Sequence, residues 1–109
     1  MLVELDAFSG RPNPRWTLAE ARAAALARLI SSLSPATGAA SLRAPGLGYR
    51  GFRLQGPDGG TYRVFRGLLQ SGNGLLADPD RRVERFLLED LPDDVRDVRP
   101  WLEGEIAAT

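Results

Sequence analysis

The sequence contains no cysteine and no histidine, and its only methionine is the first residue. The side chains that usually bind zinc, copper or haem iron are therefore missing. Nucleophilic catalysis by a cysteine or by a histidine-activated serine is excluded for the same reason. We accordingly expect no metal site and no cofactor.

Lysine is also absent, so all 14 positive charges are arginines, and 14 acidic residues balance them. A serine–lysine dyad is excluded, and any catalysis would depend on carboxylates with arginine as the electrostatic partner. A formal net charge of zero argues against a nucleic-acid partner or an anionic membrane, because binding to either depends on uncompensated cations.

The sequence also lacks the run of about 18 apolar residues that would span a bilayer. Glu4 and Asp6 interrupt the apolar stretch that a signal peptide would need, so we expect a cytoplasmic protein. The 109 residues, 43% hydrophobic and 26% charged, are typical of one globular domain. We expect a single domain over 1–109, with a functional or mobile loop at 34–48 and a loosely docked tail at 100–109.

Two patterns near the N-terminus predict a strand and a helix. Apolar and acidic residues alternate over 2–8, which is typical of a strand with one buried face. Thr17 and Glu20 form a capping box before an alanine-rich run, which predicts a helix over 18–33. The apolar side chains of this helix recur at helical spacing: Leu26, Leu29, Ile30 and Leu33.

The middle of the chain predicts a β-hairpin. Residues 49–55 and 61–70 resemble strands and flank Asp58-Gly59, a pair that suits a two-residue type I′ turn. That turn sets a register with Phe52 opposite Phe65. The face toward the core would then hold Phe52, Leu54, Phe65 and Leu69, and the other face would hold Tyr49, Arg53, Tyr62, Val64 and Arg66.

The C-terminal third predicts a helix, a short second helix and a tail. Asp78 is the predicted N-cap of the first helix, with Pro79 at its first position. A short helix follows near 93–98, and the tail would dock through Trp101. The order β-α-β-β-α-α predicts an α+β fold, a small two-layer domain with a three-stranded, mainly antiparallel sheet, a central hairpin and helices packed on one face.

The only catalytic candidates are Glu4 and Asp6. They are two residues apart on a strand, so both carboxylates point to the same side and could serve as acid and base or bind a hard cation. The alternative, which we favour, is that they form cross-strand ion pairs with Arg53 and Arg66 on a solvated sheet face.

The segment 8–14, FSGRPNP, supplies candidates for binding. Arg11 and Asn13 are flanked by glycine and proline, so a backbone with few accessible states would present both side chains at low entropic cost. The alternative is a strand-to-helix corner in which Asn13 bonds local backbone and Phe8 and Trp16 bracket the turn. The further binding candidates are Trp16 and the hairpin residues Tyr49, Arg53, Tyr62 and Arg66, types that are enriched in interface hot spots.

Three functions follow as hypotheses. The first is a small non-catalytic binding or accessory module that engages a protein or peptide partner through 9–16, 36–50 and the Tyr/Arg sheet face. The second is a small enzyme or ligand-binding protein in which Asp6 or Glu4 acts with Arg11 and Asn13 on an anionic or carbonyl-bearing small molecule. The third is a structural homodimer paired through strand edges or Trp101.

Overall fold

The computed structural model describes residues 1–8, 12–37, 42, 48–56, 59–72 and 74–107. Within these residues, one antiparallel sheet has the strand order β2-β1-β3-β4-β5-β6. The strands are β1 (Leu2–Leu5), β2 (Arg15–Thr17), β3 (Phe52–Gln55), β4 (Thr61–Phe65), β5 (Leu68–Ser71) and β6 (Gly74–Ala77). The helices are α1 (Glu20–Ser31), α2 (Arg82–Glu89) and α3 (Arg99–Ala107), and single 3-10 segments (Pro79–Arg81 and Asp93–Val98) precede α2 and α3.

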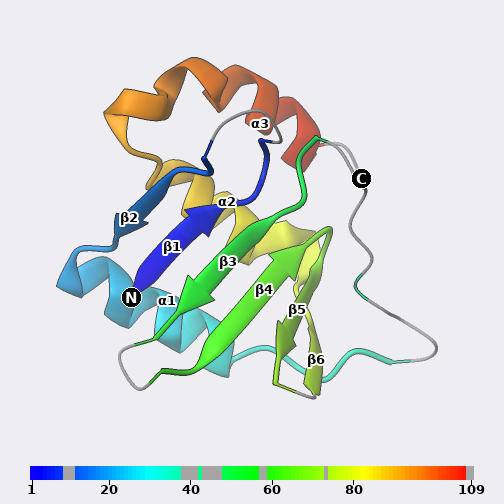
Figure 1. The fold of residues 1–109 in the computed structure, drawn as a ribbon. Coiled ribbons are helices and arrows are strands. Elements are labelled where there is room, and N and C mark those ends of the chain that lie inside the picture. Colours follow the sequence, from blue (N-terminus) through cyan, green and yellow to red (C-terminus); the bar gives the residue numbers. More distant parts are fainter. Residues whose placement is uncertain (9–11, 38–41, 43–47, 57–58, 73, 108–109) are drawn as a thin grey trace.

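The α+β class and the antiparallel sheet are confirmed, but the predicted three-stranded sheet is wrong. Six strands are present in the described part of the chain, because β2, β5 and β6 were not predicted. Figure 1 shows the sheet from its open face. Helices α1 and α2 lie behind the sheet, and α3 lies across its upper end.

β2 takes the place of the predicted strand-to-helix corner. Its three residues pair with β1 and put Thr17 opposite Leu2. Helix α1 consequently begins at Glu20, its N-cap is Ala19, and no side chain caps it. The predicted capping box is wrong because Thr17 is held in the sheet, away from the end of the helix.

The register of the β3–β4 hairpin differs from the prediction by one residue. Gly56 N donates to Gly60 O at 2.8 Å, so three residues separate this pair where the prediction had two. Asp58 itself lies outside the described residues. Phe52 therefore pairs with Val64, and a one-residue shift moves every side chain of a strand to the other face. Tyr62 and Val64 thus take core-facing positions, while Arg63 and Phe65 move to the side of Arg53.

The predicted strand over 61–70 is two strands joined by a tight turn. Arg66 and Gly67 have φ angles of 49° and 81°, and a type I′ turn needs positive φ at both central positions. Phe65 pairs with Leu68 across this turn, and the chain returns as β5. Arg-Gly is not one of the residue pairs that typically indicate such a turn, which explains why the sequence did not reveal it.

The carboxylate of Asp78 accepts a hydrogen bond from the first turn of α2, as the side chain of an N-cap does, but Asp78 does not directly precede that helix. Its two carboxylate oxygens each accept a hydrogen bond from Val83 N at 3.0 Å. The 3-10 segment separates Asp78 from α2, so Pro79 is not the first residue of that helix. Burial raises the pKa of Asp78, and the backbone amides of α2 oppose this shift.

The hydrophobic core lies between the sheet and the helices. Its fully buried members include Val3, Leu5, Phe52, Val64 and Leu69 from the sheet and Leu26, Val83 and Leu87 from α1 and α2. The C-terminal tail is helical and docks through buried Leu102 and Ile106. Docking through Trp101 is wrong, because that side chain is 39% exposed.

The predicted loop over 34–48 is described in part. Ser34 O accepts a hydrogen bond from Ala77 N at 2.8 Å, and Ala36 N donates to Leu75 O at 2.9 Å, so 34–36 runs beside β6. Residues 38–41 and 43–47 lie outside the described part. Among the described helices, none is long and apolar enough to cross a membrane.

Candidate functional site

A row of polar side chains crosses the open face of the sheet. Arg15 is opposite Glu4, and Glu4 is opposite Arg53. Arg53 is opposite Arg63, and Arg63 is opposite Gln70. Directly opposed residues share one face of a sheet, so these five side chains, which we call the cross-strand row, follow one line over β2, β1, β3, β4 and β5.

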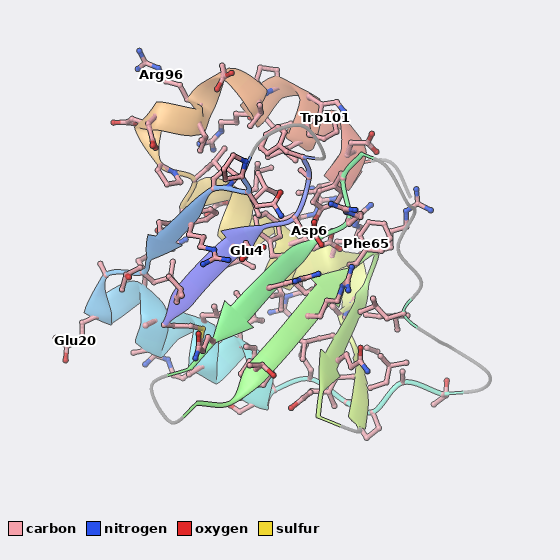
Figure 2. The ribbon with its side chains drawn as sticks, in the orientation of Figure 1. Glu4, Asp6, Glu20, Phe65, Arg96 and Trp101 are labelled. Carbon is pink, nitrogen blue, oxygen red and sulfur yellow. The ribbon has the colours of Figure 1, made fainter. Side chains whose placement is uncertain are left out.

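Asp6, just beyond β1, holds the arginines of this face together. It is 2% exposed. Its carboxylate lies 2.8 Å from Arg50, 3.3 Å from Arg53 and 3.5 Å from Arg63. Like charges directly opposite each other repel, and the shared carboxylate offsets this repulsion between Arg53 and Arg63. Figure 2 shows Glu4 and Asp6 over the front of the sheet, away from α1 and α2.

An open groove of ≈ 470 Å³ follows the cross-strand row. This volume is within the range of about 300–1,000 Å³ that is typical of ligand sites. The exposed fraction of the Arg53 side chain is 55%, so a ligand in the groove can reach its guanidinium. The groove is lined by the whole row together with Leu2, Leu54, Gln55, Thr61, Tyr62 and Gly72.

The ionised groups of this face carry an excess of positive charge. Among the described residues, three guanidiniums that line the groove (Arg15, Arg53 and Arg63) are ion-paired with two carboxylates (Glu4 and Asp6), which is an excess of one positive charge. Guanidiniums form paired, charge-assisted hydrogen bonds with carboxylates and phosphates. The groove can therefore bind an anion, although the chain as a whole has no net charge.

Asn13 connects the start of β2 to the same cluster. Its Oδ1 accepts hydrogen bonds from Ala7 N at 3.2 Å and Phe8 N at 3.0 Å. Its Nδ2 donates to Glu4 at 3.2 Å and to Asp6 at 3.4 Å. Asn13 thus bonds nearby backbone, as the alternative predicted, but the chain enters β2 in place of the strand-to-helix corner of that alternative. Arg11 lies outside the described residues.

Replacing Asn13 with alanine is expected to lower the free energy of unfolding by about 2 kcal/mol, because the buried amide of Ala7 would lose its acceptor. Urea denaturation at pH 7 measures the change. Asn13→Asp keeps an acceptor but adds a carboxylate beside Glu4 and Asp6, so its loss of stability should shrink between pH 7 and pH 4 relative to Asn13→Ala. If Asn13→Ala is as stable as the wild-type protein, Asn13 does not have the role that we assign to it.

The two catalytic candidates point to one side, as predicted, but both are occupied by arginines. Asp6 pairs with Arg53, as expected, and Glu4 pairs with Arg15 at 2.9 Å. Arg66 takes no part, because it lies in the β4–β5 turn with its guanidinium 5.2 Å from the centre of the Phe65 ring. In the described part of the chain, no three acidic, histidine or cysteine side chains gather as metal ligands would.

The aromatic binding candidates are not gathered on the open face. Tyr49 is buried, and its hydroxyl donates to Glu84 at 2.5 Å. Trp16 packs edge-on against Phe52, with 6.4 Å between the ring centres. Tyr62 borders the groove from a half-buried, core-facing position. The predicted face that combined these tyrosines with Arg53 and Arg66 therefore does not form.

The sequence did not single out Arg15, Arg50, Arg63 or Gln70. Arg63 was missed because the predicted register placed it on the core face. Burying an unpaired guanidinium costs free energy. This cost favours a register in which Arg63 lies beside Arg53 on the solvated side, and it was the signal that could have corrected the prediction.

A second charged cluster is enclosed in the fold. Glu84, which has no exposed surface, accepts hydrogen bonds from Arg81 at 2.7 and 2.9 Å and from Gly67 N at 3.1 Å. Arg81 also donates to Glu105 O at 3.0 Å. Burial and the Glu84 carboxylate raise the pKa of Tyr49, so its hydroxyl stays protonated as a donor. This cluster connects the β4–β5 turn, α2 and α3, and it has a structural role.

Comparison of the chain with protein-family models, with curated proteins and with solved structures gives no match. The groove and its charges are therefore the features of this protein that point to a function.

Proposed function

We propose that the protein is a small non-catalytic binding module that engages a protein or peptide partner through the groove on its open sheet face. The observation that supports this proposal is the excess of positive charge on the guanidiniums that line the groove, two of which, Arg53 and Arg63, are fixed by the buried carboxylate of Asp6. An arginine that is already positioned loses little conformational entropy when it engages a ligand. The arginines of the groove are thus already positioned to bind an anionic surface.

The chemistry of the same groove argues against catalysis. Asp6 lies beneath the arginines at 2% exposure, so its carboxylate cannot reach a substrate in the groove. Glu4 is ion-paired with Arg15 and hydrogen-bonded by Asn13. A general base needs access to the proton that it removes. Asp6 lacks that access, and Glu4, which lines the groove, is already engaged by Arg15 and Asn13.

A second candidate function is the binding of an anionic small molecule. The groove volume of ≈ 470 Å³ favours it, because a drug-sized ligand fits in a site of this size. In this case Arg53 and Arg63 would bind the anion, and Asp6 would position them. Asn13 would support the site from below and would not touch the ligand.

Selection from a random peptide library tests the proposed function. Wild-type protein should enrich peptides that lose binding when Arg53 and Arg63 are both replaced by glutamine. The matched control is Arg28→Gln, which removes an exposed arginine from α1, the helix layer on the opposite face. The proposal fails if no peptide is enriched, or if the enriched peptides bind the double variant as well as they bind Arg28→Gln.

A further inference from the structure

We infer that the partner segment is an extended acidic peptide that lies across the strands along the cross-strand row, with carboxylates at alternate positions facing Arg53 and Arg63. This inference depends on the proposed function and specifies the chemistry of its ligand. It is supported by the length of the row, its order of charges, its uncharged members and the fixed position of its arginines.

The length of the row matches a short extended peptide. The row begins at Arg15 on β2 and ends at Gln70 on β5, so it crosses four gaps between neighbouring strands. Neighbouring strands are about 4.8 Å apart, which makes the row about 19 Å long. An extended chain rises about 3.3 Å per residue, so about six residues cover this length. A single phosphate or carboxylate ion would occupy only a small part of it.

The order of charges along the row determines which positions of a bound peptide can be acidic. Arg53 and Arg63 are adjacent, and Glu4 separates them from Arg15. In an extended peptide, alternate side chains point to the same side and are about 6.6 Å apart, a spacing that long arginine side chains can match. Two acids at alternate positions can therefore each meet one arginine. A third acid facing Glu4 would be repelled.

The uncharged residues beside the row favour a peptide over a nucleic acid. Gln55, Thr61 and Gln70 are exposed, and their side chains can donate to and accept from a peptide backbone. Among the described residues that line the groove, Tyr62 has the only aromatic ring, and its position faces the core. Single-stranded nucleic acids need exposed rings on which successive bases stack, and this groove lacks such a series.

The arginines are held in place before any ligand binds. Asp6 contacts Arg50, Arg53 and Arg63 at the same time, and Asn13 is bonded to Asp6 and to the backbone that follows β1. The exposed side of Arg53 is consequently presented in a defined position. The peptide then supplies further carboxylates to Arg53 and Arg63, which share the single carboxylate of Asp6.

Fluorescence anisotropy with synthetic labelled hexapeptides tests this inference on the full chain. A hexapeptide with glutamate at two alternate positions and alanine elsewhere should bind at least 10-fold more tightly than the equivalent with glutamine in place of glutamate at low salt, because charge-assisted hydrogen bonds add about that much affinity. Arg53→Gln alone should weaken binding about 10-fold, and the double replacement of Arg53 and Arg63 about 100-fold. Arg28→Gln should leave binding unchanged. Circular dichroism confirms that each variant is folded.

Each other outcome has a defined meaning. Equal binding of the glutamate and glutamine peptides overturns the inference, although library peptides that need Arg53 and Arg63 would still support the proposed function. Equal binding to Arg28→Gln and the double variant also overturns it. An isomer with two adjacent glutamates, which point to opposite sides, should bind about 10-fold more weakly, and equal binding overturns the alternating arrangement. Citrate, inorganic phosphate or oligonucleotides that bind as tightly as the acidic peptide would favour those ligands instead.

Discussion

Replacing Glu84 with alanine is expected to lower the free energy of unfolding by about 3–5 kcal/mol, which is the usual cost of removing one member of a buried ion pair. The variant leaves the guanidinium of Arg81, itself 4% exposed, without its carboxylate partner. It also leaves the hydroxyl of Tyr49 and the amide of Gly67 without an acceptor. Several elements meet at this carboxylate. Its loss should therefore lower the urea concentration at which the whole domain unfolds cooperatively.

Urea denaturation followed by circular dichroism measures this effect, and Tyr49→Phe is the matched control. Removing the tyrosine hydroxyl breaks one hydrogen bond but leaves the ion pair of Arg81 and Glu84 intact, so the expected cost is about 1 kcal/mol. If Glu84→Ala and Tyr49→Phe have similar stability, the ion pair does not have the structural role that we assign to it.

Replacing Gly51 with alanine is expected to have an effect of similar size, a loss of about 4 kcal/mol, for a reason that concerns the backbone. Gly51 has a φ of 95°, and an added Cβ would lie 2.1 Å from Val64 O and 2.9 Å from Phe65 Cβ. Neither group can move easily, because Val64 and Phe65 are buried in β4. Gly51 O also accepts the amide of Asp6 at 2.9 Å, so the arginine cluster should be disturbed as well.

Gly59→Ala separates the clash from the backbone conformation. Gly59 has a φ of 87°, and an added Cβ there would meet nothing within 4 Å. Its replacement should therefore cost only about 1 kcal/mol, the penalty for a left-handed conformation. Thermal unfolding of both variants gives the comparison. Equal losses in Gly51→Ala and Gly59→Ala would contradict the importance of the close approach to Val64.

The sequence predicted those parts of the fold that depend on local patterns. The apolar spacing placed Leu26 in the core, and the acid before Pro79 identified the carboxylate that accepts a hydrogen bond from an amide of α2. It failed where one residue in a turn decides the outcome. A three-residue connection between Gly56 and Gly60 changed the face of Arg63, and an uncommon Arg66-Gly67 turn divided one predicted strand into two.

The candidate site shows the same division. The sequence placed Glu4 and Asp6 on one side of a strand and paired Asp6 with Arg53, which the structure confirms. It could not show that three arginines share one carboxylate, because that arrangement depends on the register of β1, β3 and β4 together. Register is set by the hydrophobic pattern and by turn geometry, and the turn was the part that the sequence misidentified.

The two edges of the sheet limit how this protein can associate with other chains. Residues 34–36 run beside β6, and the opposite edge, β2, has only three residues and follows Pro14. Short edge strands, prolines and charged edge residues such as Arg15 are the means by which natural sheets avoid extending into neighbouring molecules. These features work against the strand-edge form of the third hypothesis, and a homodimer through Trp101 stays a prediction. A long sheet can in this way keep an open polar face without growing by the addition of strands.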